Sequence, residues 1–429
     1  MRQGGTTSGR AHGRETAYRA SRGAGPGVLR RWPPGDSPDR RARRGFAYYA
    51  FAGWPLDTLR FSFSSELAED ISRTEGAITQ LNDDPPRTAL LEAVARQLLR
   101  AEAVASSRIE GLEISHRGLA EAAFAPERTS GTPRGVYANV RAMEEAIRLA
   151  SKSRPLRVDD IRAIHRRLFE GTRDERLGGA IRQKQNWIGG SDYSAYGAEF
   201  IPVPEAETLP LLADLCAFME RDDLPAIAQA ALVHAQFETI HPFMDGNGRV
   251  GRSLVHVVLR RRGLAPHYVP PISVALAANA DGYVDGLTAY REQRFEDWMT
   301  IFVHATAASV ARARDLSSEI EALQAEWRKQ AERPRADSAA AKLITLLPLQ
   351  PVVDVRTAAA ALKVSDEAAR QAIDRLARSG VLQEVTGRQR GRSWECVGLF
   401  ALLDDFDRAV AMPSGGSPTR RAPRRRKTA

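Results

Sequence analysis

The sequence predicts a mainly helical protein with one β-hairpin and a C-terminal winged-helix domain. Residues 88–105 and 249–262 space their apolar side chains three and four positions apart, as in helices that bury one face. Two extended runs, residues 182–190 and 199–204, flank a segment rich in Gly, Ser and Tyr, which is typical of a hairpin. From residue 336 onward, short helices precede two strand-like runs joined by a basic turn, which is the order of elements in a winged helix.

Both ends of the chain are basic and of low complexity. Residues 1–45 carry eleven arginines against three acidic residues, a net charge of +8. Residues 413–429 carry five arginines and one lysine without an acid, a net charge of +6. Because the whole chain carries +9, the part between these ends is acidic. We expect both ends to be disordered, and either to contact nucleic acid electrostatically or to remain solvated tails.

These patterns divide the chain into six segments. They are a disordered basic tail over 1–45, a helical region over 46–150, a central core over 151–305, a linker helix over 306–335, a winged helix over 336–405 and a second disordered basic tail over 406–429.

Composition points to a cytoplasmic protein without a membrane partner. No apolar run approaches the roughly 18–20 residues that cross a bilayer. No apolar stretch follows the basic start, as it would in a secretion signal. The two cysteines, Cys216 and Cys396, lie far apart and form neither a disulfide framework nor a metal pattern.

The stretch from His241 to Arg252 begins with a glycine-rich turn suited to an anion. Gly246, Asn247 and Gly248 can turn several backbone N–H groups toward one point. The helix predicted from Arg249 onward would place that turn at its positive N-terminus, where phosphate groups bind.

The charged residues of the same stretch suit a nucleotide triphosphate. Arg249 and Arg252 are three positions apart and therefore project from one helix face. Asp245 is an oxygen ligand suited to Mg²⁺, which prefers one or two carboxylates together with substrate phosphates. His241 is the group here that can accept a proton near neutral pH.

These twelve residues match, at every defined position, the HPFx(D/E)GNGRxxR signature of the Fic (filamentation induced by cAMP) family, so the chain resembles Fic proteins. Fic proteins transfer AMP from ATP to a hydroxyl group of a target protein and release pyrophosphate. The resemblance implies that residues 151–305 are a Fic catalytic core that uses ATP and Mg²⁺. The roles it implies are His241 as the general base, Asp245 as the Mg²⁺ ligand, Gly246, Asn247 and Gly248 as the binding site of the α-phosphate, Arg249 and Arg252 as ligands of the outer phosphates, and Phe243 as a buried anchor of the loop.

A second motif, Ser106-Ser-Arg-Ile-Glu110-Gly111, follows the helix predicted over 88–105. It resembles the [S/T]xxxE[G/N] inhibitory motif of many Fic proteins, and Ser106 and Glu110 would share a helix face. The resemblance implies that Glu110 pairs with Arg252 and keeps it from the γ-phosphate. In some relatives the same glutamate also orients a water that removes AMP.

The hairpin over 182–204 resembles the flap of Fic proteins, which docks the backbone of the target by strand addition. We expect Phe200, Ile201 and Pro202 to lie over the nucleotide and the target. Farther along, Asp281-Gly-Tyr283 begins a helix, and Tyr283 would either stack on adenine or belong to the core.

In the winged helix, Thr357 is expected to cap the helix over 358–363, and Ser365 to cap the helix that ends before Gly380. Strands are expected at 381–385 and 393–400. The polar stripe of Gln371, Arg375 and Arg378 would enter the DNA major groove. The wing arginines Arg388, Arg390 and Arg392 would contact phosphate. Winged helices also serve as protein-docking or dimerisation modules, so DNA is one candidate partner among these.

The sequence therefore predicts a protein adenylyltransferase that Glu110 holds inactive, acting on a Ser, Thr or Tyr hydroxyl. The alternatives are a DNA-binding regulator whose Fic core senses nucleotide, and a Fic enzyme that removes AMP or uses another nucleotide donor. An intact His241 and Asp245 favour catalysis over sensing. The sequence leaves open the target protein and the oligomeric state, a homo-oligomer included.

Overall fold

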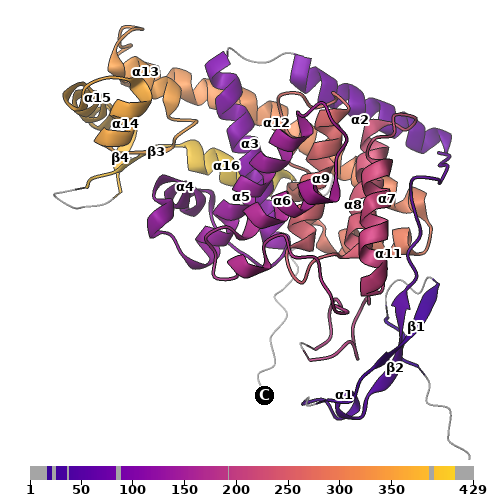
Figure 1. Ribbon diagram of the computed structural model, residues 1–429. Coiled ribbons are helices and arrows are strands. Elements are labelled where there is room, and N and C mark those ends of the chain that lie inside the picture. The colour runs from indigo at the N-terminus through magenta and orange to yellow at the C-terminus, as the bar shows by residue number, and fades with distance from the viewer. Residues whose placement is uncertain are drawn as a thin grey trace, which may run out of the picture.

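Helices form most of the molecule in this computed structural model, which describes residues 17–21, 26–35, 38–83, 88–191, 193–385 and 391–410 (Figure 1). The predicted fold class, mainly helical with small β-sheets, is confirmed. The helices are α1 (Arg40–Arg44), α2 (Ser65–Asp83), α3 (Thr88–Ile109), α4 (His116–Phe124), α5 (Gly131–Ala150), α6 (Val158–Phe169), α7 (Thr208–Phe218), α8 (Ala226–Ile240), α9 (Asn247–Arg261), α10 (Ile272–Ala278), α11 (Ala280–Arg291), α12 (Phe295–Gln330), α13 (Ala339–Leu346), α14 (Val355–Leu362), α15 (Asp366–Arg378) and α16 (Leu399–Val410). The strands are β1 (Gly27–Trp32), β2 (Phe46–Phe51), β3 (Val352–Val353), β4 (Leu382–Glu384) and β5 (Trp394–Cys396).

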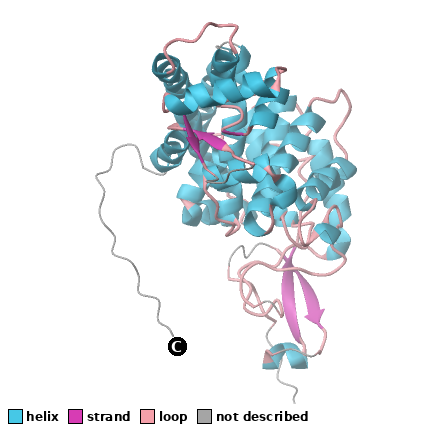
Figure 2. Cartoon of the chain, turned by 90° about the vertical axis from the view of Figure 1, so that its left-hand side faces the viewer, coloured by secondary structure: helices cyan, strands magenta, loops and turns pink. Residues whose placement is uncertain are grey.

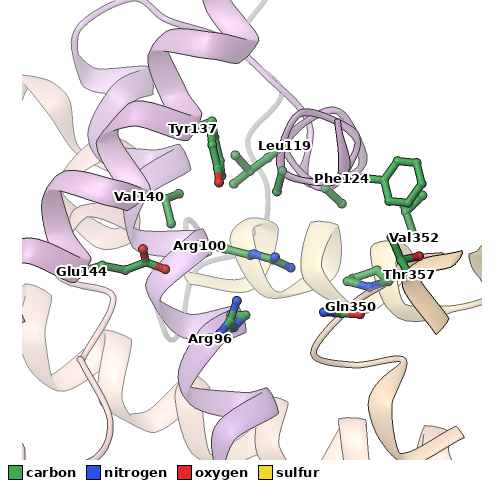
Figure 3. A pocket seen from close by; sticks show the side chains of 13 residues that line it. Arg96, Arg100, Leu119, Phe124, Tyr137, Val140, Glu144, Gln350, Val352 and Thr357 are labelled. Atoms are coloured by element: carbon green, nitrogen blue, oxygen red, sulfur yellow. The ribbon is translucent and has the colours of Figure 1, made fainter. Parts of the chain in front are cut away.

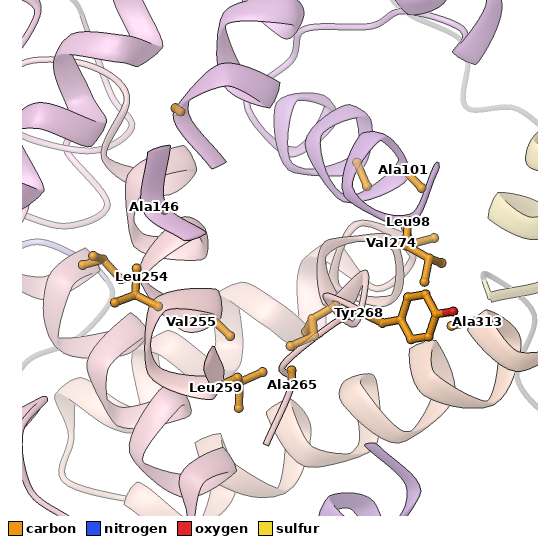
Figure 4. Packing of buried hydrophobic residues seen from close by; sticks show 14 of the residues in the cluster. Leu98, Ala101, Ala146, Leu254, Val255, Leu259, Ala265, Tyr268, Val274 and Ala313 are labelled. Atoms are coloured by element: carbon orange, nitrogen blue, oxygen red, sulfur yellow. The ribbon is translucent and has the colours of Figure 1, made fainter. Parts of the chain in front are cut away.

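The centre of the helical body is the pair α8 and α9. Every residue of α8 is buried, and its sequence is mainly apolar or small, with a few polar residues such as His234 and Glu238. In α9 all residues from Asn247 to Leu259 are buried. Figure 4 shows part of this core, where Leu254 and Val255 of α9 lie among side chains from neighbouring helices. Because both helices are enclosed, the loop between them is held from both ends.

Residues 27–32 and 46–51 form an antiparallel ribbon, which corrects the prediction of a disordered tail over 1–45. Strands β1 and β2 pair from Gly27 opposite Phe51 to Trp32 opposite Phe46. One face of the ribbon carries aromatic side chains, and Trp32 contacts Trp187 edge-to-face at 5.3 Å. The abundance of Arg and Gly hid this alternating aromatic pattern in the composition of the segment. Residues 1–16 lie outside the described residues.

The two runs of the predicted hairpin pair antiparallel at one bridge, between Ile188 and Phe200, so the paired part is much shorter than the two expected runs. The backbone N–H of Ile188 donates to the carbonyl of Phe200 at 2.9 Å, and that of Glu199 donates to Ile188 at 2.8 Å. Gly189 and Gly190 both have positive φ, which ends the pairing one residue after it begins.

Helix α12 is one 36-residue element that starts inside the expected core, at Phe295, rather than a separate linker from 306. Its N-terminal part is buried against α11 and α8, where Trp298 donates to the carbonyl of Ala231 at 2.8 Å. Its C-terminal part packs on α13 and α16. The same helix therefore belongs to the core and supports the C-terminal domain.

The elements from α13 to β5 follow in the order expected for a winged helix. They include a three-stranded sheet with strand order β3-β5-β4, which lies at the opposite end of the molecule from the ribbon (Figure 2). Ser365 caps α15 as expected, and its hydroxyl accepts from the N–H of Ala368. The cap of α14 is Asp354 rather than Thr357, because Asp354 and Thr357 form a reciprocal capping box that starts the helix earlier.

The end of this domain differs from the expected strand and tail. Strand β5 stops at Cys396, and Leu399 begins α16, which contains the expected domain boundary at 405 and residues 406–410 of the expected tail. The apolar face of this helix packs on α12, which explains why the segment is helical. Residues 411–429 lie outside the described residues. Arg388 and Arg390 lie outside the described residues. No helix among the described residues is long and apolar enough to span a membrane.

Candidate active site

The loop from His241 to Gly246 joins the C-terminus of α8 to the N-terminus of α9. His241 caps α8 in the left-handed conformation, with φ of 50°. Gly246 precedes α9 with φ of 79°, and a side chain there would approach Leu168 to 2.8 Å and Phe169 to 3.0 Å. Both the conformation and the lack of space therefore require glycine at position 246.

The N-terminus of α9 has no side-chain cap. Among the described residues, the backbone N–H groups of Asn247, Gly248 and Arg249 donate no hydrogen bond. Free N–H groups at the positive end of a buried helix form an anion-binding site. The turn predicted to hold phosphate thus has three donors in place.

The side chain of Asn247 is used within the loop, so its backbone N–H, rather than its amide side chain, is available to a phosphate. Its Oδ1 accepts from the N–H of Phe243, and its Nδ2 donates to the carbonyl of Phe243, both at 2.8 Å. Phe243 is fully buried, as expected. Asn247 therefore fixes the shape of the loop, and its backbone N–H is the group left for an anion.

Three residues outside the signature hold this loop, and none was identified from the sequence. Arg182, 3% exposed, donates to the carbonyls of His241 at 2.9 Å and Val203 at 2.5 Å. Asn186 donates to the carbonyl of Phe243 at 2.9 Å. His165 of α6 stacks on the Phe243 ring at 3.6 Å.

His165 also fixes the position of Asp245. Its Nδ1 accepts from the N–H of Gly179 at 2.8 Å, so Nε2 carries the hydrogen and donates to the carbonyl of Asp245 at 2.9 Å. Burial lowers the pKa of His165 to about 4, which keeps it in this neutral form at neutral pH.

His241 faces the pocket as a neutral imidazole. Its Nδ1 lies 3.3 Å from the carbonyl of Glu238, which can only accept, so the proton resides on Nδ1 and Nε2 is left with a lone pair. Burial, reinforced by the charge of Arg291, lowers the pKa of His241 to about 4. The side chain is 17% exposed. It is therefore able to accept a proton at neutral pH.

Glu238 lies directly behind this histidine and was also missed. Its Oε2 is 3.7 Å from His241 Nδ1, and its Oε1 has no hydrogen-bond partner among the described residues. Burial, together with the nearby charge of Glu110, raises the pKa of Glu238 to about 7. A sequence signal existed, because an acid inside a mainly apolar helix is unusual.

Asp245 is the accessible carboxylate of the loop, with its side chain 57% exposed. Its Oδ1 accepts from the N–H of Gly246 at 2.6 Å and lies 3.5 Å from Arg249 Nη2. Its Oδ2 has no partner among the described residues and is free to bind a cation. One open carboxylate beside an anion site fits Mg²⁺ that arrives with phosphates. No group of three or more His, Cys, Asp or Glu suited to a metal occurs among the described residues.

Arg252 is occupied by the segment that carries the second motif. The side chain is 2% exposed, and its Nη2 donates to Glu110 Oε1 at 2.7 Å. Its Nε donates to the hydroxyl of Ser106, and Nη2 also donates to the Ser106 carbonyl, both at 2.8 Å. The predicted contact of Glu110 with Arg252 is present in the structure.

Both partners of this pair are charged. Burial alone would raise the pKa of Glu110, but the charge and hydrogen bond of Arg252 outweigh it, and the pKa lies below its usual value. Burial would likewise lower the pKa of Arg252, but the charge of Glu110 raises it above its usual value. The carboxylate also lies against α9, because a Cβ on Gly248 would come within 1.9 Å of Glu110 Oε1.

Gly111 positions Glu110 by ending α3. Its φ is +78°, and the N–H of Leu112 donates to the carbonyl of Ser107 at 2.9 Å. This arrangement is a Schellman motif, in which the left-handed residue favours glycine. Ser106 therefore lies in the last turn of α3. Glu110 follows the end of the helix and lines the pocket.

The pocket around these groups has a volume of about 330 Å³. Of the three flap residues expected over the nucleotide, only Phe200 lines it among the described residues, and the Arg291 guanidinium lies 3.6 Å from its ring centre. Ile201 is buried against the ribbon, and its carbonyl accepts from the N–H of Phe51 at 2.9 Å. Pro202 is also buried, so Ile201 and Pro202 do not face the pocket.

Tyr283 lines the pocket but does not offer a free ring face for adenine. Its ring stacks on His234 at 5.8 Å, and its hydroxyl hydrogen-bonds to His234 Nε2 at 2.8 Å. Arg252 Nη1 donates to the same hydroxyl at 3.4 Å. The residue belongs to the core, and its hydroxyl supports Arg252.

Comparison with known proteins locates this site in a family domain. Residues 155–259 match the Fic/DOC family. Protein adenylyltransferase fic-1 of Caenorhabditis briggsae is 32% identical over 125 residues, covering 28% of this chain and 23% of that protein. Protein adenylyltransferase Fic of Drosophila willistoni is 33% identical over 123 residues, covering 26% and 21%. The chain thus spans less than a quarter of the length of these curated relatives.

Among solved structures, a Fic family protein from Desulfovibrio desulfuricans is 20% identical, with a TM-score of 0.47 over 79% of this chain and 98% of that one.

Proposed function

Because residues 155–259 form a Fic/DOC domain, we propose that this protein transfers AMP from ATP to a hydroxyl group of a protein. The observation that carries the proposal is the uncapped N-terminus of α9 beside the unprotonated Nε2 of His241. The N-terminus of α9 would bind a phosphoryl group, and His241 Nε2, which faces the same pocket, would accept a proton. This combination suits attack by a hydroxyl on phosphorus.

In the proposed reaction, His241 Nε2 removes the proton of the incoming hydroxyl as its oxygen attacks the α-phosphorus. The bond from that phosphorus to the bridging oxygen of the β-phosphate breaks, and pyrophosphate leaves. The free N–H groups of α9 stabilise the charge that develops on the α-phosphate oxygens. Asp245 Oδ2 would hold Mg²⁺, which neutralises phosphate charge. Glu238 behind His241 keeps the imidazole oriented.

We further propose that Glu110 inhibits this reaction in two ways. It occupies Arg252, a ligand for the outer phosphates, through the 2.7 Å contact. Its carboxylate also lies against Gly248, where it repels an anion at the N-terminus of α9. Transfer would then require α3 or its last turn to move.

The test is incubation of Glu110→Gly protein with Mg²⁺ and ATP labelled on the α-phosphate, with and without cell lysate. Label on protein is expected, and the Glu110→Gly/His241→Ala double variant should show none. A parallel reaction with γ-labelled ATP should leave protein unlabelled, which separates AMP transfer from phosphorylation. Label from α-labelled UTP but not from ATP would move the proposal to another donor. Loss of pre-attached AMP from the protein would indicate the reverse reaction.

We propose that the target docks on the flap over residues 182–204, next to the bridge between Ile188 and Phe200. Among the described residues, Gly189 and Gly190, directly after this bridge, form no backbone hydrogen bond. A target strand would add there and bring its hydroxyl toward His241.

We propose that the winged helix regulates its own chain rather than reading DNA. Arg375, expected in the DNA-facing stripe, donates to the carbonyl of Ala331 at 2.7 Å and is partly covered by the end of α12. Gln97 of α3 donates to the carbonyl of Pro348 at 2.5 Å, which ties the domain to the helix that leads to Glu110. Retained affinity for duplex DNA in an Arg375→Ala, Arg378→Ala variant would favour a different DNA-binding face, and no affinity in the parent protein would favour regulation.

A further inference from the structure

A partly enclosed cavity of about 190 Å³ lies between the helices that carry the inhibitory segment and the winged helix. Figure 3 shows Arg96 and Arg100 of α3 extending into it, with Val140 of α5 on one side and Gln350 and Thr357 of the winged helix on the other. The residues that line it are different from those that line the candidate active site.

Arg100 is a buried cation without a hydrogen-bond or ion-pair partner among the described residues, and the acid whose charge acts on it is Glu144. The arginine is 9% exposed, its Nη1 has no hydrogen-bond partner, and it forms no ion pair among the described residues. An unpaired buried charge destabilises a fold unless something compensates it. Burial, reinforced by the nearby charge of Arg96, lowers the pKa of Arg100 to about 10, so it stays charged at neutral pH.

The other side chains around Arg100 indicate which kind of ligand would pair with it. Arg96 is held only by a 3.8 Å contact with Glu92, and the side chain of Gln350 forms no hydrogen bond among the described residues. Two guanidinium groups and an amide suit an oxyanion, which arginine binds with paired hydrogen bonds. Leu119, Phe124 and Val140 form an apolar wall beside them.

We propose that this cavity binds a small organic anion, whose phosphate or carboxylate group lies between Arg96 and Arg100 and whose apolar part contacts Leu119, Phe124 and Val140. Glu144, which also lines the cavity, lies 3.4 Å from Arg141 and would accept a hydrogen bond from a ligand hydroxyl or amine. Binding would join α3 to the winged helix. Any effect on Glu110 at the end of α3 rests on the function proposed above, whereas the binding itself does not.

The test is the thermal unfolding of the full chain with phenyl phosphate, benzoate and uncharged benzamide, followed by calorimetric titration. Phenyl phosphate or benzoate should raise the Tm of the parent protein, and benzamide should not. Arg100→Met should weaken binding by about tenfold or more, as expected for loss of a charged hydrogen bond. Without ligand, its Tm should equal or exceed that of the parent, since an uncompensated charge is removed.

Two further variants locate the bound probe. Arg370→Met, which changes an exposed arginine of α15, should bind as the parent does. Arg249→Met alters the candidate active site and should also leave the signal intact. Binding that survives Arg100→Met, or that disappears with Arg249→Met instead, would overturn the proposal. So would the absence of any shift with both anions.

Discussion

Replacing Glu110 by glycine removes the carboxylate that pairs with Arg252 and should raise the rate of AMP transfer. The pair joins Arg252, 2% exposed, to a glutamate side chain that is 31% exposed. A hydrogen bond to a charged group contributes about 1.5–3 kcal/mol, and partial solvent access favours the lower end of this range. Since 1.4 kcal/mol corresponds to a tenfold change, we expect a rate increase of about tenfold or somewhat more.

The assay is the initial rate of label transfer from α-labelled ATP at saturating Mg²⁺. Glu110→Gln should give an intermediate rate, because an amide can still contact Arg252 but carries no charge. Glu113→Gln, on the exposed turn after Gly111, is the matched control and should leave the rate unchanged. Equal rates for the parent and Glu110→Gly, with ATP binding intact in both, would refute the inhibitory role of the pair.

Three other perturbations have defined outcomes. His241→Ala in the Glu110→Gly background should lower transfer at least about a hundredfold while calorimetry still detects ATP binding; retained transfer would exclude His241 as the base. Because the pKa of His241 is lowered to about 4, the base is neutral above that pH, so kcat/KM should fall only as the pH approaches 4; a midpoint near 6.5 would contradict the buried environment. Glu102→Ala leaves the buried His256 and Ser273 without their shared acceptor, so the free energy of unfolding measured in urea should fall by about 3–5 kcal/mol. The exposed Glu92→Ala is the control and should change it little.

The signature residues could be predicted because they are contiguous. His241, Asp245 and Arg252 lie on one loop and the start of one helix, so their spacing in the sequence was enough to predict that they lie close together. The contact of Glu110 with Arg252 joins residues 142 apart, and it was anticipated through the resemblance rather than from spacing. The end of α3 at Gly111 follows from the preference of glycine for a left-handed cap.

What the sequence did not indicate depends on contacts between distant segments. Arg182 and His165 support the loop through backbone carbonyls, and no local pattern marks a side chain for that use. The sequence allowed Tyr283 either to stack on adenine or to belong to the core, and its stacking on His234 places it in the core. The ribbon at residues 27–51 was missed because its few aromatic residues stand among many arginines and glycines.

The contact between α3 and α16 has a consequence for the order in which the chain folds. Arg108, two residues before Glu110, donates to Asp407 at 2.9 Å across a separation of 299 residues. During synthesis the chain emerges from its N-terminus, and domains fold as they become complete. The region that matches the Fic/DOC family ends at residue 259, so it is synthesised long before Asp407. The growing chain therefore passes through a stage in which the segment that carries Arg108 and Glu110 has been synthesised but Asp407 has not.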